Sequence, residues 1–427
     1  MALSVVRSAG ILIKPSEKTP SVTLDLSAID RIPVLRCNAR TLHVFKHGPG
    51  AARVLQAALS KALVPYYPLA GRLTEPVPGQ LQVECCTEGV RFVEAMSGCI
   101  LEEVDYFQDV ESIPYDELLP EKYEDPDGRE PLIQMQVTQF ACGGFVIGLI
   151  FCHSICDGLG AAQFLHAVGE FARGHESLTI DPIWHRNFFT SHKIAPDNPP
   201  MFPLSQPPPM PNYQLNHANI DVPLDQITRL KLKSHELMGQ NCSTFEAVAA
   251  SFWRSRTQAV RFDPGTQVML VFFANCRDAV DPPLPKGFYG NCFFPVTIEA
   301  SSDWIEKASF ADVVKLIQQA KSKLPIEFAR YMQGECHVDP FAPPLVYTTL
   351  FMSEWGRLGF NQVDYGWGPP VHVVPIQGSS IIPVGIVGVL PLPQKGIRLM
   401  TWCIEEDHKQ GLLNHMGKVL STPGDLK

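Results

Sequence analysis

A proline-rich segment in the middle of the chain restricts its fold more than any other feature. Residues 196–211 contain eight prolines and end in the run QPPPMP. Proline lacks the backbone N–H that a helix interior or a central strand needs, so this segment can be neither. We interpret residues 191–218 as an extended crossover between an N-terminal domain, residues 1–190, and a C-terminal domain, residues 219–427. A chain of 427 residues is long enough for two domains of ordinary size.

Hydrophobic patterns on both sides of the crossover predict a mixture of helices and strands. The first half is expected to contain a helix over residues 51–63, a hairpin over residues 81–95, strands over residues 135–140 and 145–152, and a helix from near residue 158. Residues 145–152 are continuously apolar, which is typical of a central strand buried on both faces.

In the second half we expect a helix over residues 224–235, a second helix after Ser243, and an apolar strand that ends near Arg277. Ser243 and Glu246 have the spacing of a capping box, in which each residue binds the backbone N–H of the other at a helix start. Because helices and strands alternate throughout, each half is predicted to be a layered α/β domain.

Composition argues against several classes of partner. The net charge of −9 makes nucleic acid an unfavourable partner, and no apolar run approaches the roughly 20 residues needed to cross a bilayer. The N-terminus does not resemble a signal peptide, so the twelve cysteines are interpreted as reduced thiols in a cytoplasmic protein. No pair of C-x-x-C units occurs, and we predict no metal site.

The stretch FCHSICDGLG, residues 151–160, is the strongest candidate for chemistry because it follows the predicted central strand. A metal site would need ligands beyond His153, Cys152 and Cys156, and no partner cluster is visible. A serine nucleophile is disfavoured because the chain has no G-x-S-x-G elbow and Ser154 adjoins the histidine. Two readings stay open from the residues alone: a buried, satisfied histidine in a turn, or a general base that takes a proton from an attacking hydroxyl. Asp157 could orient this histidine or hold the loop.

A second motif turns this pattern into a family resemblance. The H-x-x-x-D-G pattern of residues 153–158 combines with DYGWG at residues 364–368, together with YPLAGRL, CSTFEAV, FFANCR and FYGNCFFPV. In these features the chain resembles the BAHD family of plant acyl-CoA-dependent acyltransferases, whose second signature is usually D-F-G-W-G. The resemblance implies two chloramphenicol-acetyltransferase-like α/β domains with mixed sheets, joined by a long crossover. It also implies an active-site channel between the domains, with the histidine at its centre.

The resemblance also implies roles for individual residues. His153 would be the general base, while Asp157 would point away from the channel and pair with Arg277. Asp364 is treated as essential in the family and is kept as a catalytic candidate, although the composition of its loop favours a structural role. Loop support is expected from a further set: Gly158, Tyr365, Gly366, Trp367 and Gly368.

Ser353 and Trp355 match family positions close to the reaction centre, and Ser353 could donate a hydrogen bond to the developing oxyanion. Ser243 and Thr244 lie at a predicted helix N-terminus, where free N–H groups favour the phosphates of coenzyme A. Gly290 and Asn291 are expected to line the channel near the pantetheine arm.

The expected activity is O-acylation by direct transfer in a ternary complex of acyl-CoA, a small-molecule alcohol and the protein. Blocks such as RLGFNQVDYGWGPP resemble monolignol transferases, and residues 142–174 resemble taxane acetyltransferases and benzyl alcohol benzoyltransferases. We favour a hydroxycinnamoyl or benzoyl donor and a monolignol or other specialised metabolite as acceptor. Acetyl transfer to a terpenoid or other alcohol is the alternative, and a catalytically silent binding protein is the alternative of another class. The protein is expected to be a monomer without a tightly bound cofactor.

Overall fold

A computed structural model describes residues 3–123, 128–190, 211–376 and 381–421. Its helices are α1 (Ala51–Ala62), α2 (Tyr115–Leu118), α3 (Gly158–Ala172), α4 (Leu224–Met238), α5 (Thr244–Val260), α6 (Ser302–Lys307), α7 (Phe310–Gln333) and α8 (Glu406–Ser421). Most of the predicted crossover, residues 191–210, lies outside the described residues. In the ranges described, no helix is both long and apolar enough to span a membrane.

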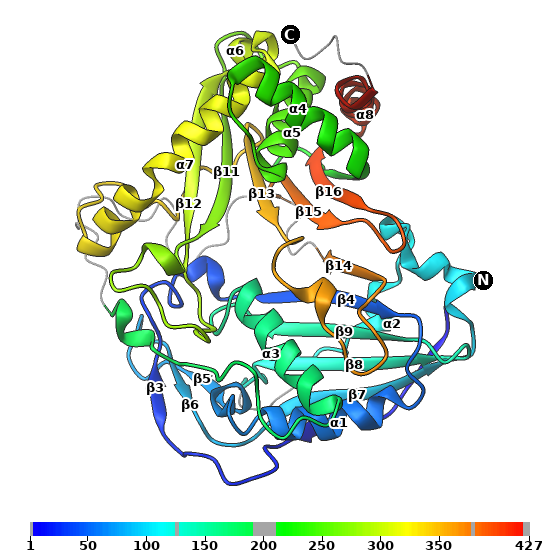
Figure 1. Ribbon diagram of the computed structural model, residues 1–427. Coiled ribbons are helices and arrows are strands. Elements are labelled where there is room, and N and C mark those ends of the chain that lie inside the picture. The colour runs from blue at the N-terminus through cyan, green and yellow to red at the C-terminus, as the bar shows by residue number, and fades with distance from the viewer. Residues whose placement is uncertain (1–2, 124–127, 191–210, 377–380, 422–427) are drawn as a thin grey trace.

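The first of three sheets forms the lower half of the molecule in Figure 1. Its strands, in spatial order, are β1 (Val5–Arg7), β7 (Val90–Ser97), β8 (Ile133–Phe140), β9 (Phe145–Cys152), β4 (Asn38–Phe45) and β14 (His372–Ile376), and β2 (Ile11–Ile13) also pairs with β7. The pair β7–β8 is parallel and the other pairs are antiparallel, so the sheet is mixed. Strand β9 lies between β8 and β4, as its continuous apolar sequence predicts.

The second sheet forms the upper half, with α4, α5, α6, α7 and α8 packed around it (Figure 1). Its order is β10 (Asn216–Pro223), β16 (Gly396–Ile404), β15 (Val384–Val389), β13 (Thr349–Glu354), β11 (Gln267–Asn275) and β12 (Phe293–Ser301). A third, small sheet has the order β3 (Thr23–Asp25), β6 (Gln82–Glu84) and β5 (Arg72–Thr74). In the second sheet the pairs β11–β13 and β13–β15 are parallel and the others are antiparallel, so both halves contain mixed sheets, in agreement with the predicted α/β class.

The structure differs from the sequence prediction in three respects. The predicted hairpin over residues 81–95 is wrong, because β6 pairs with β3 and β5 whereas β7 pairs with β1, β2 and β8. Strand β10 begins at residue 216, inside the predicted crossover of residues 191–218. Strand β14 comes from the second half of the chain but pairs with β4 in the first sheet. The sheets therefore do not follow a simple division of the chain at the crossover.

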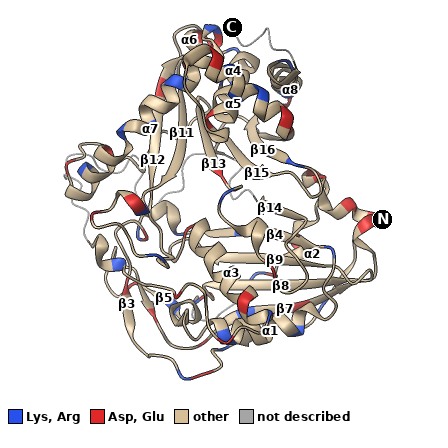
Figure 2. Cartoon of the chain, in the orientation of Figure 1, with Lys and Arg blue, Asp and Glu red and all other residues tan. Residues whose placement is uncertain are grey.

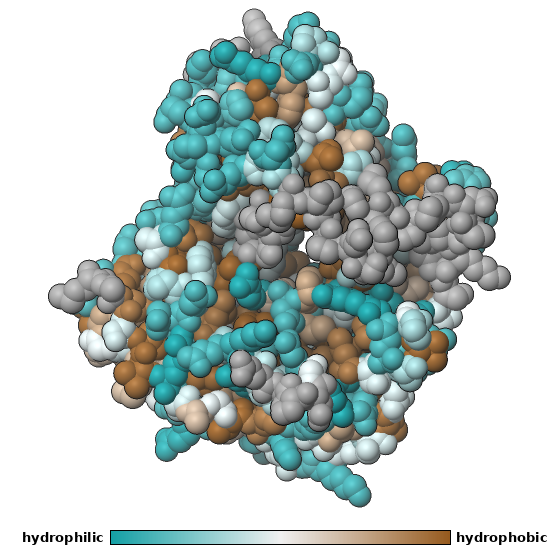
Figure 3. Space-filling view, turned by 180° about the vertical axis from the view of Figure 1, so that it is seen from behind, coloured by the Kyte–Doolittle hydropathy of each residue, from teal (hydrophilic) through white to brown (hydrophobic). Residues whose placement is uncertain are grey.

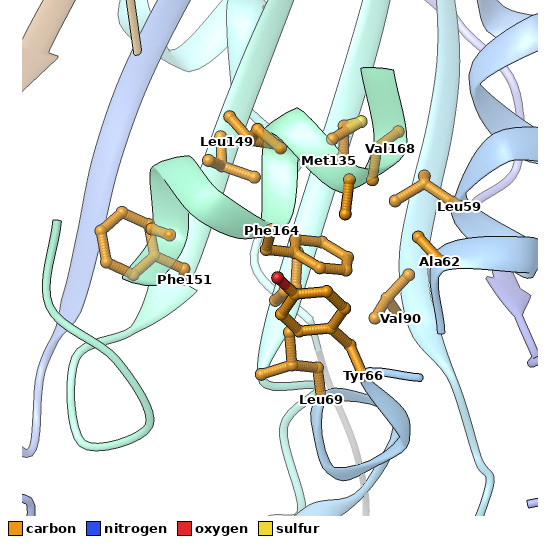
Figure 4. Packing of buried hydrophobic residues seen from close by; sticks show 14 of the residues in the cluster. Leu59, Ala62, Tyr66, Leu69, Val90, Met135, Leu149, Phe151, Phe164 and Val168 are labelled. Carbon is orange, nitrogen blue, oxygen red and sulfur yellow. The ribbon is translucent and has the colours of Figure 1, made fainter. Parts of the chain in front are cut away.

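Apolar side chains from α1 and α3 form the main core of the lower half against one face of the first sheet. Figure 4 shows Leu59 of α1 and Phe164 and Val168 of α3 packed towards Met135 and Leu149 of the sheet. Strands β8 and β9 contain no charged residues, and Figure 2 shows charge mainly on the outer helices and loops. This packing fixes the end of β9 and the start of α3, between which residues 153–157 lie.

A further cluster joins the halves on the other face of the first sheet. Leu42 and Val146 of this sheet pack in one buried cluster with Ile386 of β15 and Met400 of β16. Burying such side chains stabilises the contact by about 1.5–3 kcal/mol each. The junction between the halves is therefore an apolar interface.

Candidate active site

His153 follows β9 directly, and its backbone is fixed on both sides. Its N–H donates to the carbonyl of Cys37 at 2.9 Å, and its carbonyl accepts from the Asn291 side-chain amide at 2.8 Å. The imidazole is half-buried, lies between Phe151 and Phe293 at centroid distances of 6.3 and 6.2 Å, and has no described side chain as a hydrogen-bond partner. Its Nδ1 is buried and has no described hydrogen-bond partner, so Nε2 is the nitrogen available to act as a general base on this fixed backbone.

Asp157 caps α3 and forms a two-pronged ion pair with Arg277. Its carboxylate accepts from the Gly160 N–H at 3.0 Å and from both terminal nitrogens of Arg277 at 2.8 Å. Burial alone would raise the pKa of Asp157, but the charge and hydrogen bonds of Arg277 outweigh it and hold this pKa below its usual value. Both carboxylate oxygens are bound to Arg277, which favours a role for Asp157 as a brace of the loop over a role as the partner of the His153 imidazole.

Gly160 follows this cap where the two halves meet. A Cβ on Gly160 would collide with the backbone carbonyl oxygen of Tyr289, so only glycine lets α3 approach the second half this closely. Gly290 is restricted in the same way, because a Cβ there would overlap the Arg186 guanidinium.

The connection between β11 and β12, residues 276–292, supplies the second half's part of the site. Figure 1 shows it descending from the upper sheet towards the lower half. The Gly290 carbonyl accepts from Arg277 at 2.7 Å, and the Asn291 amide reaches the carbonyl of His153. The residues expected to line the pantetheine arm therefore support the histidine loop.

The alternative chemistries at this loop find no support. The Ser154 hydroxyl is buried and donates to the carbonyl of Leu35 at 2.9 Å, which turns it away from the imidazole. Burial raises the pKa of the Cys152 thiol to about 11 and that of Cys156 well above its usual value, so neither is a thiolate at neutral pH. Across the described ranges, no cluster of three or more His, Cys, Asp or Glu residues is placed to hold a metal.

The DYGWG loop lies at the far end of α3. The Asp364 carboxylate accepts from the N–H groups of Gly366 and Gly368 at 2.7 and 2.8 Å, and its carbonyl accepts from Arg173 just after α3. Its carbonyl also lies against Gly169, twelve residues beyond Asp157, which corresponds to about 18 Å along the helix. This position does not fit the catalytic role predicted for Asp364, because the residue cannot share reacting atoms with His153.

The remaining residues of this loop pack against the first sheet. Tyr365 is buried beside Phe45, and Trp367 lies edge-on to Phe145 at the start of β9. The structure thus brings the DYGWG loop to the opposite end of the strand from His153.

Ser353 and Trp355 lie at the end of β13. The Trp355 indole N–H donates to the Ser353 hydroxyl oxygen at 3.1 Å, and its ring stacks on Phe360 at 5.6 Å. Trp355 connects to the start of α3, because its carbonyl accepts from the Leu358 N–H and Leu358 lies against Gly158.

Ser243 and Thr244 begin α5 in the second half. The predicted capping box is present: the Ser243 hydroxyl accepts from the N–H of Glu246, and the Glu246 carboxylate accepts from the N–H of Ser243. Glu246 also pairs with Lys321. A carboxylate at this terminus competes with a phosphate for the same N–H groups, so the geometry does not favour coenzyme A binding there.

Two buried residues beside the site were missed from sequence. Asp30 contacts the Asn291 amide, and Arg186 donates to the carbonyl of Ile155. Ser27 and Asp30 have the S-x-x-D spacing of a capping box, which could have marked this turn. No local pattern marks Arg186.

Seen from behind, the surface is hollowed where the two halves meet (Figure 3).

Comparisons with known proteins cover nearly the whole chain. The family model described as Transferase family matches residues 3–402. Acyl transferase 4 of Oryza sativa subsp. japonica is 42% identical, over 96% of this chain and 97% of that protein. Myricetin 3-O-glucosyl 1,2-rhamnoside 6'-O-caffeoyltransferase AT2 of Crocosmia x crocosmiiflora is 37% identical, over 97% of this chain and 99% of that protein.

Among solved structures, TRI101 of F. sporotrichioides in complex with coenzyme A and T-2 has the same fold. Its TM-score is 0.73 at 16% identity, with 92% of this chain and 97% of that chain covered. The expected chloramphenicol-acetyltransferase-like fold is confirmed.

Fold and sequence together define an enzyme of the acyltransferase class. The chain belongs to the Transferase family, the BAHD acyl-CoA-dependent acyltransferases of plants. The family resemblance and the enzyme class predicted from the motifs are confirmed.

Proposed function

We propose that this enzyme transfers an aromatic acyl group from coenzyme A to a hydroxyl group of a plant specialised metabolite or monolignol. The observation that carries this proposal is the geometry of His153, whose backbone is held at both ends while its ring makes no described hydrogen bond. Nε2 of His153 takes the proton of the acceptor hydroxyl as the hydroxyl oxygen attacks the thioester carbonyl. The C–S bond then breaks, and the histidine returns the proton to the leaving thiolate.

Ser353 supports the same reaction as the oxyanion donor. Indole nitrogen can only donate, so the Ser353 oxygen accepts from Trp355 and its own hydroxyl hydrogen stays free. We propose that this hydrogen stabilises the oxygen of the tetrahedral intermediate. We propose that acyl-CoA and acceptor reach His153 from between the two halves, where Asn291 of the second half contacts the backbone of His153.

The preference for an aromatic donor rests on the rings around His153. Phe293 lies edge-on to the imidazole and also edge-on to Phe273 at 5.5 Å, and Phe273 is 42% exposed. Aromatic side chains beside the reacting group suit a hydroxycinnamoyl or benzoyl chain better than an acetyl group. The caffeoyl transfer named for the Crocosmia relative is consistent with this choice. We further propose that the enzyme acts as a cytoplasmic monomer with acyl-CoA as a co-substrate.

The test is thiol release from p-coumaroyl-CoA, benzoyl-CoA and acetyl-CoA with a panel of alcohols. We expect acceptor-dependent release from the aromatic donors. Release from acetyl-CoA alone would contradict the donor class, and no acceptor-dependent release from any donor would favour a silent binding protein.

A variant pair tests the general base. His153→Ala should lower kcat by about 100- to 10,000-fold, the usual contribution of a positioned base, with an unchanged melting temperature. His175→Ala, at an exposed histidine after α3, is the matched control and should leave kcat unchanged. Full activity of His153→Ala would contradict the assignment.

A further inference from the structure

A buried carboxylate that the reaction does not use lies next to the catalytic loop. Asp30 has no exposed surface and lies in a turn after β3. One of its oxygens accepts from the backbone N–H and the hydroxyl of Ser27, at 3.0 and 2.7 Å. These local bonds occupy only one carboxylate oxygen. A carboxylate is buried at acceptable cost only when its other contacts are also satisfied.

Asn291 satisfies the second oxygen of Asp30 and continues to the catalytic histidine. Its backbone N–H and its side-chain amide both donate to Asp30, at 3.1 and 2.8 Å. The same amide nitrogen donates to the carbonyl of His153 at 2.8 Å. Asp30 therefore fixes the orientation of the group that holds the backbone of His153.

Arg186 forms a second connection from Asp30 to the same loop. One terminal nitrogen lies 3.5 Å from an Asp30 oxygen, and the other donates to the carbonyl of Ile155 at 2.7 Å. The guanidinium is buried and lies over the rings of Trp184 and Phe288, at 4.4 and 5.1 Å. These rings enclose the guanidinium, and the Asp30 carboxylate supplies its ion pair.

We propose that Asp30 is a positioning residue that sets the place of the His153 imidazole through Asn291 and Arg186. The two connections hold the carbonyls of residues 153 and 155 from one buried carboxylate, so the backbone on both sides of residue 154 is fixed. The Asp157–Arg277 pair holds the other end of the loop and also binds Gly290 and Cys292, on either side of Asn291, whereas Asp30 binds Asn291 itself. This inference rests on the proposed role of His153 as general base.

The main variant is Asp30→Asn. Its amide nitrogen replaces one carboxylate oxygen, so a site surrounded by hydrogen-bond donors loses one acceptor. A small shift of a catalytic group can cost on the order of 100-fold in rate, and we expect kcat to fall about 10- to 100-fold. The KM for acyl-CoA and the dissociation constant of free coenzyme A should change less than about twofold. Ser27→Ala is the matched control, since it removes a hydrogen bond from Asp30 but leaves both connections to the loop.

A double-variant comparison separates positioning from general loss of structure. Asp30→Asn should lower kcat in the wild-type background but not in His153→Ala, because the group that it positions is then absent. An equal fall of kcat in both backgrounds, or a fall in Ser27→Ala as large as in Asp30→Asn, would overturn the proposal.

A second variant covers the case in which Asp30→Asn does not fold. Asn291→Ala keeps the backbone N–H on Asp30 but removes the amide from the His153 carbonyl, and it should reproduce the fall in kcat. An unchanged kcat in Asn291→Ala would refute the connection through the amide. Loss of the general-base role itself would be seen separately, as full activity of the single variant His153→Ala.

Discussion

Replacing Asp157 by Asn tests whether this residue braces the loop or takes part in the chemistry. Asparagine is as good a helix N-cap as aspartate, so the bond to the Gly160 N–H should survive. What is lost is the charge that pairs with both terminal nitrogens of Arg277. The substitution therefore isolates the ion pair from the cap.

The magnitude follows from the burial of this pair. The side chains of Asp157 and Arg277 are 10% and 14% exposed, and Arg277 would be left without its counter-charge. Removing one partner of a buried pair costs about 3–5 kcal/mol, and the retained cap favours the lower value. For 427 residues that unfold together, 1 kcal/mol corresponds to about 1 °C, so the melting temperature should fall by about 3–5 °C.

The assay measures melting by calorimetry and thiol release at a temperature where the variant is folded. Asp225→Asn is the matched control, because Asp225 forms an exposed pair with Arg229 that contributes at most about 0.5 kcal/mol. We expect loss of stability together with partial loss of activity for Asp157→Asn, and neither for the control. Lost activity with unchanged melting would refute the brace and favour a direct catalytic role.

The acid range gives an independent check on the same pair. Pairing with Arg277 lowers the pKa of Asp157 in the folded state, so its stabilisation is present above about pH 4. This stabilisation is lost as the pH falls through the folded-state pKa. The wild type and Asp157→Asn should therefore approach the same stability at low pH, and a constant difference would contradict the ion pair.

Three further predictions follow from packing and burial. Gly160→Ala should lower the free energy of unfolding by about 1–3 kcal/mol, because a backbone carbonyl blocks the new methyl group. Gly158→Ala should lower it less, because its methyl group meets only a leucine side chain. Similar melting temperatures for the two variants would contradict this prediction. Burial lowers the pKa of His43 to about 3 and that of His372 to about 4, so the unfolded chain binds protons that the folded chain does not. The free energy of unfolding should then fall by up to about 2.7 kcal/mol per pH unit below about pH 6, with a smaller slope in urea titrations of His43→Gln. Asp364→Asn keeps an oxygen that accepts from both loop N–H groups, so it should retain most of the activity. Asp364→Ala removes this oxygen and should lose activity together with stability. An Asp364→Asn variant that is inactive but fully stable would instead indicate that Asp364 takes part in the chemistry.

Local sequence signals predicted the elements that depend on local physics. The apolar run of β9, the helix after it and the capping box at Ser243 all follow from contacts within a few residues. The hairpin over residues 81–95 was wrong because its two strands join different sheets, and Gly89 instead donates its N–H to Ala70. Strand pairing is set by distant partners, which no local pattern contains.

The contacts of the candidate site were likewise predicted only in part. The pair of Asp157 and Arg277 was expected from the family resemblance and is present. Asp30 and Arg186 were missed because their hydrogen-bond and ion-pair partners are at least 31 residues away along the chain, apart from the turn that Asp30 forms with Ser27. Asn291 was expected near the site, but its contact with the His153 backbone could come only from the structure.

The bonds that shape the loop cross the chain over long distances, and this has a consequence for how the enzyme becomes active. Asp157 and Arg277 are 120 residues apart, Asn291 and His153 are 138 apart, and Asn291 and Asp30 are 261 apart. Closing such loops costs conformational entropy that only the completed contacts offset, so these bonds form late in folding. The first half can build β9 and α3 from its own residues, but it cannot place His153 without the connection between β11 and β12. Activity in a refolding experiment should therefore return after helical structure, and no faster than the two halves join.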